Sequence, residues 1–183
     1  MDREPFSRLK SLVNFLLIVP LGYLVACAVL YFRQDSMIFV PDRGTEAEQD
    51  PLADAEGFEP WTNARGERIG WKSRDGDDAN VLLVFSGNGG YALRRTYYRE
   101  FCRKNAGNWR TFLLEYPGYG FRPGQPSESS LTAAAVEALD GLSASPGRKI
   151  RVLGVSLGSG VACAAVSRRP QAVAGLILET PFN

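Results

Sequence analysis

The 183 residues carry 21 lysines and arginines against 20 aspartates and glutamates, and 45% of them are hydrophobic. This near-neutral balance excludes the strongly basic surface of a nucleic-acid-binding domain, and the apolar content excludes a disordered chain. The sequence contains no histidine and three scattered cysteines, so these residues alone form neither a histidine-ligated metal site nor a catalytic imidazole. We therefore expect no metal, no cofactor and no nucleic-acid partner.

The N-terminal part has the composition of a membrane-spanning helix. Residues 11–32 carry no charge and are rich in Leu, Val, Ile, Phe and Ala. A helix of that length is about 33 Å long, which is enough to cross the hydrocarbon core of a bilayer. Basic residues before the segment favour a cytoplasmic N-terminus and an exported remainder. We expect a basic flank over 1–10, one transmembrane anchor over 11–32 and the folded domain over 33–183.

Two alternatives compete with an uncleaved anchor. The residues Leu24-Val25-Ala26-Cys27 match a bacterial lipoprotein cleavage box, which would make Cys27 a lipidated N-terminus. The apolar run nevertheless continues to Phe32, whereas mature lipoproteins usually begin with polar residues. A plain cleaved secretory signal has an apolar region of about 7 to 15 residues, which is shorter than this one.

The segment after the apolar stretch contains short apolar islands among turn-forming residues. Residues 37–41 and 67–71 are candidate edge strands. The run of Asp and Gly over residues 74–78 predicts a turn before the next apolar segment.

From residue 80 onward, predicted strands and helices alternate. Continuous apolar runs predict buried strands over residues 81–85, 111–116, 150–155 and 173–178. Alternation at this spacing predicts an α/β domain with a mostly parallel sheet and right-handed crossovers.

Helices fill the intervals between these strands. They are predicted over residues 91–104, from a cap at Ser127 or Ser129 to Leu142, and over residues 158–168. Four-residue spacing places Leu93, Tyr97 and Phe101 on the buried face of the first helix. We expect Cys102 and Cys163 to be small buried hydrophobic residues of these helices.

The run Gly154-Val155-Ser156-Leu157-Gly158 matches the pattern G-x-S-x-G between a predicted strand and a predicted helix. A tight turn there projects the Ser156 hydroxyl above the strand ends, and a side chain at Gly154 or Gly158 would collide with the neighbouring elements. The backbone N–H of Leu157 lies at the helix start and can stabilise an oxyanion. Ser156 is therefore the candidate nucleophile. The alternative is a small-residue turn that serves strand–helix packing alone.

The run Ser86-Gly87-Asn88-Gly89-Gly90 follows the first strand of the alternating region. Glycines allow the backbone to approach a substrate carbonyl, so the backbone N–H of Asn88 or of Gly89 is the candidate second oxyanion donor. The alternative is a glycine-rich turn that binds nothing. The run lacks both the G-x-G-x-x-G pattern and the P-loop lysine, which excludes a nucleotide-binding loop.

These motifs, in this order, resemble the α/β-hydrolase superfamily, and they include residues 85–90, 115–120, 154–158 and 179–182. More narrowly they are similar to its membrane-anchored branch, related to serine-aminopeptidase-like hydrolases and protein depalmitoylases. The resemblance implies an α/β-hydrolase fold behind an N-terminal transmembrane helix. It also implies hydrolysis of an ester, thioester or amide through an acyl-enzyme on Ser156, with a small molecule, a lipid or an acyl-peptide as substrate.

The sequence departs from the family pattern at two places. Ser86 stands where the family usually has a structural His, so we expect a modest effect on the oxyanion loop. The catalytic Asp and His of the family follow later strands, whereas this sequence ends at Asn183. We therefore expect a sheet truncated after the fourth clear strand, which becomes an exposed apolar edge, and an isolated chain without activity. The family pattern makes Glu179 a structural residue.

Three hypotheses follow. The chain is the first part of an ordinary serine hydrolase, a non-catalytic membrane-anchored binding protein derived from a hydrolase, or an enzyme that takes its His and Asp from another chain.

Overall fold

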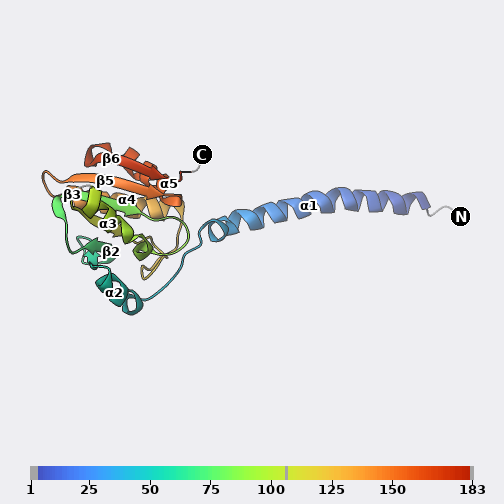
Figure 1. Cartoon of the computed structure of the whole chain (residues 1–183). Helices are drawn as coiled ribbons and strands as arrows, with labels where there is room; N and C mark the ends of the chain where they lie inside the picture. Colours follow the sequence, from blue (N-terminus) through green and yellow to red (C-terminus); the bar gives the residue numbers. More distant parts are fainter. Residues whose placement is uncertain (1–3, 106, 182–183) are drawn as a thin grey trace. The chain divides into compact units, whose positions relative to one another are not determined.

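A computed structural model describes residues 4–105 and 107–181 of the chain (Figure 1). The contacts within the chain divide it into two units, Met1–Ile38 and Phe39–Asn183. The first unit is one helix and the second is the folded domain.

The first unit is helix α1 (Glu4–Ile38), which contains Pro20. Its segment Val13–Ile38 is long and apolar enough to cross a membrane, a property that both an anchor and a signal sequence share. The helix thus continues past the predicted end of the anchor at residue 32. Met37 and Ile38 belong to it, so the predicted edge strand over residues 37–41 is wrong. Pro41 is the first helix-breaking residue after Pro20 and Gly22, and it restricts the residue before it to extended backbone.

The second unit is built on one mixed sheet. Its described strands are β1 (Phe58–Thr62), β2 (Arg68–Ser73), β3 (Asp77–Phe85), β4 (Trp109–Leu114), β5 (Lys149–Val155) and β6 (Val173–Glu179). Their order across the sheet is β1-β2-β4-β3-β5-β6. The pairs β1–β2 and β2–β4 are antiparallel, and the other three pairs are parallel. The predicted parallel sheet is confirmed, whereas the strand predicted over residues 67–71 lies inside the sheet rather than at its edge.

The helical segments of this unit are α2 (Glu46–Ala55), η1 (Ala92–Arg95), α3 (Tyr97–Asn105), α4 (Glu128–Ser143), α5 (Leu157–Arg168) and η2 (Pro170–Ala172). Sequence reasoning missed α2 and β1. The signal for α2 was present, because Thr45 and Glu48 form a capping box at its start. Ser127 caps α4, as predicted, because its hydroxyl accepts a hydrogen bond from the Ser130 N–H.

The helix predicted over residues 91–104 is divided into η1 and α3. Leu93 is buried as expected, but Tyr97 is 51% exposed and Phe101 is 57% exposed, while Tyr98 and Cys102 are buried instead. The 3₁₀ turn has three residues per turn rather than 3.6, which rotates the following helix relative to a continuous one. Cys163 is also exposed, so its predicted burial is wrong.

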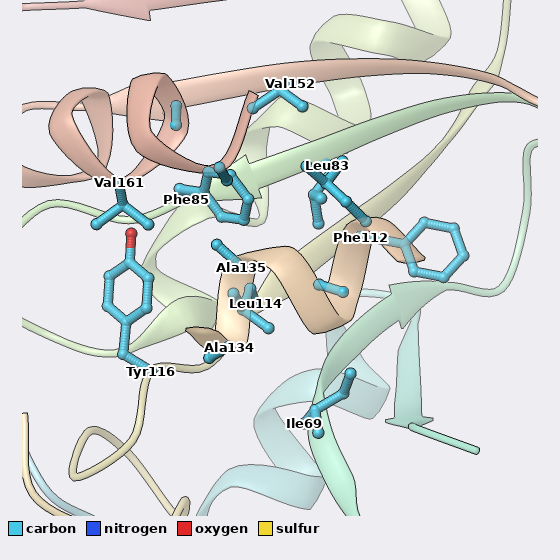
Figure 2. Packing of buried hydrophobic residues seen from close by; sticks show 14 of the residues in the cluster. Ile69, Leu83, Phe85, Phe112, Leu114, Tyr116, Ala134, Ala135, Val152 and Val161 are labelled. Atoms are coloured by element: carbon cyan, nitrogen blue, oxygen red, sulfur yellow. The ribbon is translucent and has the colours of Figure 1, made fainter. Parts of the chain in front are cut away.

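Helices cover both faces of the sheet. Successive residues of a strand point to opposite faces, and β3 shows this directly. Val81, Leu83 and Phe85 pack in the cluster that includes residues of α4 and α5 (Figure 2). Leu82 and Val84 pack in the cluster that includes residues of α2, η1 and α3.

Strand β6 is one of the two edges of the described sheet, because it pairs with β5 alone. Leu176, Ile177 and Leu178 are 39%, 45% and 38% exposed. The predicted apolar edge is therefore present in the part of the chain that the structure describes. Exposed apolar edges of this kind promote association between chains.

Glu115 directly follows β4 and fixes the end of that strand. Its side chain is 1% exposed, and both carboxyl oxygens accept hydrogen bonds from the Ala92 N–H, at 3.1 and 3.2 Å. Gly120 lies against the same carboxyl group, since a Cβ there would be 2.3 Å from Oε2 of Glu115. Burial raises the pKa of Glu115 to about 8, although the nearby charges of Arg122 and Arg68 act in the opposite direction.

We predict that Glu115 makes the stability of the domain depend on pH. Between the ordinary pKa of 4.5 and the raised value of about 8, the unfolded chain loses this proton while the folded chain keeps it. The free energy of unfolding therefore falls as pH rises through this window and stays low above it. Glu115→Gln removes this contribution, which urea unfolding of the full chain in detergent at several pH values measures. Glu128→Gln, at an exposed position, serves as the control, and an unchanged pH profile in Glu115→Gln contradicts the assignment.

Candidate active site

Ser156 occupies a strained turn between β5 and α5. Its backbone angles are φ 50° and ψ −114°, a conformation that residues with a side chain rarely adopt. Its N–H donates a hydrogen bond of 2.9 Å to the carbonyl oxygen of Glu179, which ties the turn to the end of β6. The side chain of Ser156 is exposed. Strand, turn and helix thus present its hydroxyl to solvent at the carboxyl ends of the parallel strands.

The two glycines of the G-x-S-x-G run permit this turn because nothing larger fits. A Cβ on Gly158 would lie 2.1 Å from the carbonyl oxygen of Phe85 at the end of β3. A Cβ on Gly154 would lie 2.4 Å from the carbonyl oxygen of Gly158 and 2.8 Å from Cβ of Ala162. Helix α5 therefore starts in direct contact with both strands beneath it, and this contact fixes the turn.

Leu157 is the first residue of α5, and the N–H groups of a first helical turn have no partner within the helix. Such N–H groups attract negative charge. Ser159 is not a second nucleophile, because its buried hydroxyl donates a hydrogen bond of 2.9 Å to the Gly154 carbonyl oxygen.

The loop after β3 lies beside this turn. Phe85 and Gly154 are partners in the parallel pair β3–β5, so the chain leaves both strands at the same edge of the sheet. A Cβ on Gly87 would be 3.4 Å from the Val155 carbonyl oxygen and 3.6 Å from Cβ of Ser156. By contrast, a Cβ on Gly89 would meet no atom within 4 Å. Of the two candidate donors in this loop, Asn88 is the residue that directly follows Gly87.

The side chain of Asn88 holds the loop in place. Its Oδ1 accepts hydrogen bonds from the Val40 N–H, at 2.9 Å, and from the Tyr119 hydroxyl, at 2.8 Å. Burial raises the pKa of Tyr119 to about 12, so this hydroxyl keeps its proton near neutral pH. The Asn88 side chain is thus engaged within the domain, and a contribution to an oxyanion site would come from its backbone N–H.

The residues 39–44, which we call the strap, are the part of the site that sequence reasoning missed. Pro41 pairs with Gly90 and Arg43 pairs with Gly120, in parallel bridges. The strap therefore lies along both the loop after β3 and the loop after β4. Its ion pair joins Arg94 Nη2 to Asp42 Oδ2, at 2.6 Å.

Ser86 and Glu179 both have structural contacts. The carbonyl oxygen of Ser86 accepts a hydrogen bond from the Tyr116 hydroxyl at 3.1 Å, while its own buried hydroxyl has no partner within residues 4–105 and 107–181. The carboxylate of Glu179 accepts a hydrogen bond from the Tyr98 hydroxyl. No side chain of the described residues hydrogen-bonds to Oγ of Ser156. The site therefore offers a hydroxyl and N–H groups, with no proton acceptor of the described residues hydrogen-bonded to that hydroxyl.

No metal-binding arrangement accompanies this site. The structure of residues 4–105 and 107–181 contains no cluster of three or more His, Cys, Asp or Glu residues that could hold a metal ion. An open groove of about 1180 Å³ lies between α4 and the β1–β2 hairpin, and its lining includes Trp61, Ile69 and Glu137 but not Ser156. This groove is thus separate from the candidate nucleophile.

The strand order, the turn at Ser156 and the loop after β3 define the class of the protein. A model of the alpha/beta hydrolase fold matches residues 80–183, which is more than half of the chain. The chain belongs to the α/β-hydrolase family, and the resemblance noted in its motifs is confirmed. A crystal structure of an alpha-beta hydrolase from Vibrio vulnificus shares this fold, with a TM-score of 0.54 and 22% identity, over 75% of this chain and 50% of that one.

Curated relatives extend the likeness beyond the matched domain. The protein Rv2307c of Mycobacterium tuberculosis is 32% identical over 176 residues, which cover 91% of this chain and 61% of the relative. The lysophosphatidylserine lipase ABHD12 of Gallus gallus is 31% identical over 128 residues, which cover 67% of this chain and 34% of the relative. The chain therefore spans less than two thirds of the length of these relatives.

We predict that Gly158→Ala destabilises the domain by about 2–4 kcal/mol, because the added methyl group would overlap the Phe85 carbonyl oxygen. Gly141→Ala on α4 is the matched control. A Cβ there meets no atom within 4 Å, so the change is neutral or stabilises by up to about 1 kcal/mol. Chemical unfolding of the full chain in detergent measures both values. Equal stability of the two variants would contradict the close contact between α5 and β3.

Proposed function

We propose that the protein is a serine hydrolase that cleaves an ester, thioester or amide through an acyl-enzyme on Ser156. The observation that carries this proposal is the backbone conformation of Ser156, which has a φ of 50°. The Cβ atom of Ser156 also lies close to Gly87 in the loop after β3. A strained serine between a buried strand and a helix is the arrangement of the nucleophile in the α/β-hydrolase fold.

In the proposed reaction, Oγ of Ser156 attacks the acyl carbon and its proton passes to a base. The backbone N–H groups of Leu157 and Asn88 stabilise the negative charge that develops on the carbonyl oxygen. Expulsion of the leaving group gives the acyl-enzyme, and water then releases the acid. Gly154 and Gly158 keep the turn in shape throughout.

The base is the missing part of this scheme. A serine hydroxyl is a weak nucleophile near neutral pH unless an adjacent base removes its proton. The 183 residues contain no histidine. The described neighbours of Ser156 are also engaged elsewhere, since Glu179 accepts its hydrogen bond from Tyr98. We therefore propose that the activity requires a base from outside these residues.

We propose an acyl lipid as the substrate and the membrane as the place of reaction. The apolar segment Val13–Ile38 supports this location, since it can hold the domain at a bilayer. The name of the relative ABHD12, a lysophosphatidylserine lipase, supports a lipid ester. Single-pass anchoring with the domain exported is the proposed arrangement, and lipidation of Cys27 is its alternative.

A non-catalytic binding protein is the second candidate function. No described side chain accepts a hydrogen bond from the Ser156 hydroxyl, and the nearby Glu179 carboxylate is bonded to Tyr98, which favours this candidate. Such a protein would keep the turn and the loop after β3 as a ligand site, without acyl transfer.

We predict that the 183-residue chain does not react measurably with a fluorophosphonate probe and shows no esterase activity above a Ser156→Ala control. The reason is the absence of a base that removes the Ser156 proton. A chain extended through a downstream reading frame that encodes a further Asp and His, if one exists, gains both properties. Ser156→Ala in the extended chain abolishes them again. Peptide mass spectrometry locates the adduct.

Stoichiometric labelling of Ser156 in the 183-residue chain would show that another group acts as the base. Failure of an extended chain to label at Ser156, with its fold intact, would overturn the assignment of Ser156 as the nucleophile. The non-catalytic binding protein would then be the remaining candidate function.

A further inference from the structure

Arg95 differs from the other arginines of η1 and α3 in having no carboxylate partner. Arg94 pairs with Asp42 at 2.6 Å, Arg99 pairs with Asp75 at 2.7 Å and Arg103 pairs with Glu100 at 2.7 Å. Within the part of the chain that the structure describes, Arg95 forms no ion pair, and its buried Nε atom has no hydrogen-bond partner. A half-buried guanidinium without a partner has lost part of its hydration without compensation.

The guanidinium of Arg95 lies at the candidate active site. A Cβ on Gly87 would be 3.4 Å from Nη2 of Arg95 and 3.6 Å from Cβ of Ser156, so a single methyl group there would approach both residues. The positive charge of Arg95 also acts on the buried Tyr116 hydroxyl, where it counteracts the rise in pKa that burial causes. Arg95 is thus a cation whose guanidinium reaches Gly87, the residue of the loop after β3 that lies beside Ser156.

A second polar group beside Gly87 also lacks a partner. The hydroxyl of Ser86, the residue that precedes Gly87, is buried and forms no hydrogen bond with any described residue. Two polar groups without a hydrogen-bond partner among the described residues, Arg95 Nε and the Ser86 hydroxyl, therefore belong to residues next to Gly87, which lies beside Ser156. Buried polar groups in folded proteins are usually paired, and exceptions near a reactive residue point to a ligand.

We infer that Arg95 binds a negatively charged group of the substrate and selects acyl compounds that carry such a group near the reacting carbonyl. A guanidinium binds a carboxylate or a phosphate through paired N–H donors, and both anions share this chemistry. The inference rests on the proposed function only in taking Ser156 as the reacting position. Arg95 is then a specificity residue, separate from the N–H groups of Leu157 and Asn88 that would hold the oxyanion.

The test places a thiol at the reacting position and needs no acyl transfer. In the full chain with Cys27→Ser and Cys163→Ser, Ser156→Cys leaves one exposed thiol, because Cys102 is buried. Methyl methanethiosulfonate, a neutral reagent, modifies this thiol in non-ionic detergent, and mass spectrometry gives the rate. Hexyl phosphate, hexanoate and hexanol are added as protecting ligands. The two anions distinguish a phosphate from a carboxylate, and hexanol reports binding of the alkyl chain alone.

At least one of the two anions is expected to slow modification of the thiol more strongly than hexanol. Arg95→Gln should raise the half-protecting concentration of that anion at least about tenfold, since a hydrogen bond to a charged group is lost. Arg103→Gln, at an exposed arginine of α3 that already pairs with Glu100, should leave it unchanged. Arg95→Lys keeps the positive charge and should give an intermediate value, which provides a second measurement if Arg95→Gln does not fold.

Equal protection in Arg95→Gln, Arg95→Lys and the parent chain would overturn the inference, and so would anions that protect no better than hexanol. Fluorophosphonate labelling of the extended chain, with Ser156 in place, remains a separate readout. Anion-dependent protection without labelling of a folded extended chain would contradict the proposed hydrolase while keeping the anion site. Labelling of the extended chain without such protection would overturn the anion site while keeping the hydrolase.

Discussion

The close contact between the start of α5 and the end of β3 is the constraint on which the candidate site depends. With hydrogen at Gly158 in place of a side chain, the helix approaches the Phe85 carbonyl oxygen directly. The preceding residue pair, Ser156 and Leu157, must then complete the strand-to-helix connection in a very short turn. That geometry forces the positive φ of Ser156 and directs its hydroxyl away from the sheet. The stability of the packed core thus sustains the strained turn.

The loop after β3 and the turn at Ser156 lie at the same edge of the sheet. Strands β3 and β5 are neighbours although β4 lies between them in the sequence, and their crossover helices cover opposite faces. Such a change in strand order opens a space at the carboxyl ends of the strands, where α/β proteins bind ligands. The strap is hydrogen-bonded to the Asn88 side chain in the loop after β3, and Glu115 is hydrogen-bonded to the start of η1, which carries Arg95. The hydrogen bond between Glu115 and the start of η1 therefore helps to position Arg95, whose Nε atom has no partner among the described residues.

Much of this arrangement could be predicted from the sequence, because local patterns determine it. Apolar runs identified β3, β4, β5 and β6, and glycine spacing identified the turn at Ser156. The strap could not be predicted, since its contacts with Gly90 and Gly120 join residues far apart in the chain. The prediction of the buried face of α3 was wrong because the preceding segment η1 is a 3₁₀ turn, which shifts the helical period. The position of Arg95 could not be predicted either, because only tertiary contacts reveal which arginines of η1 and α3 lack a carboxylate partner.

The backbone conformation of Ser156 tests the central claim most directly. Residual dipolar couplings and scalar couplings from NMR of the isotopically labelled chain in detergent give φ at this residue. The account predicts a positive φ near 50° at Ser156, and a negative φ for the helical residues that follow it. A negative φ at Ser156 in the folded chain would contradict it, because the hydroxyl would then not be presented by a strained turn and the site would have no nucleophile.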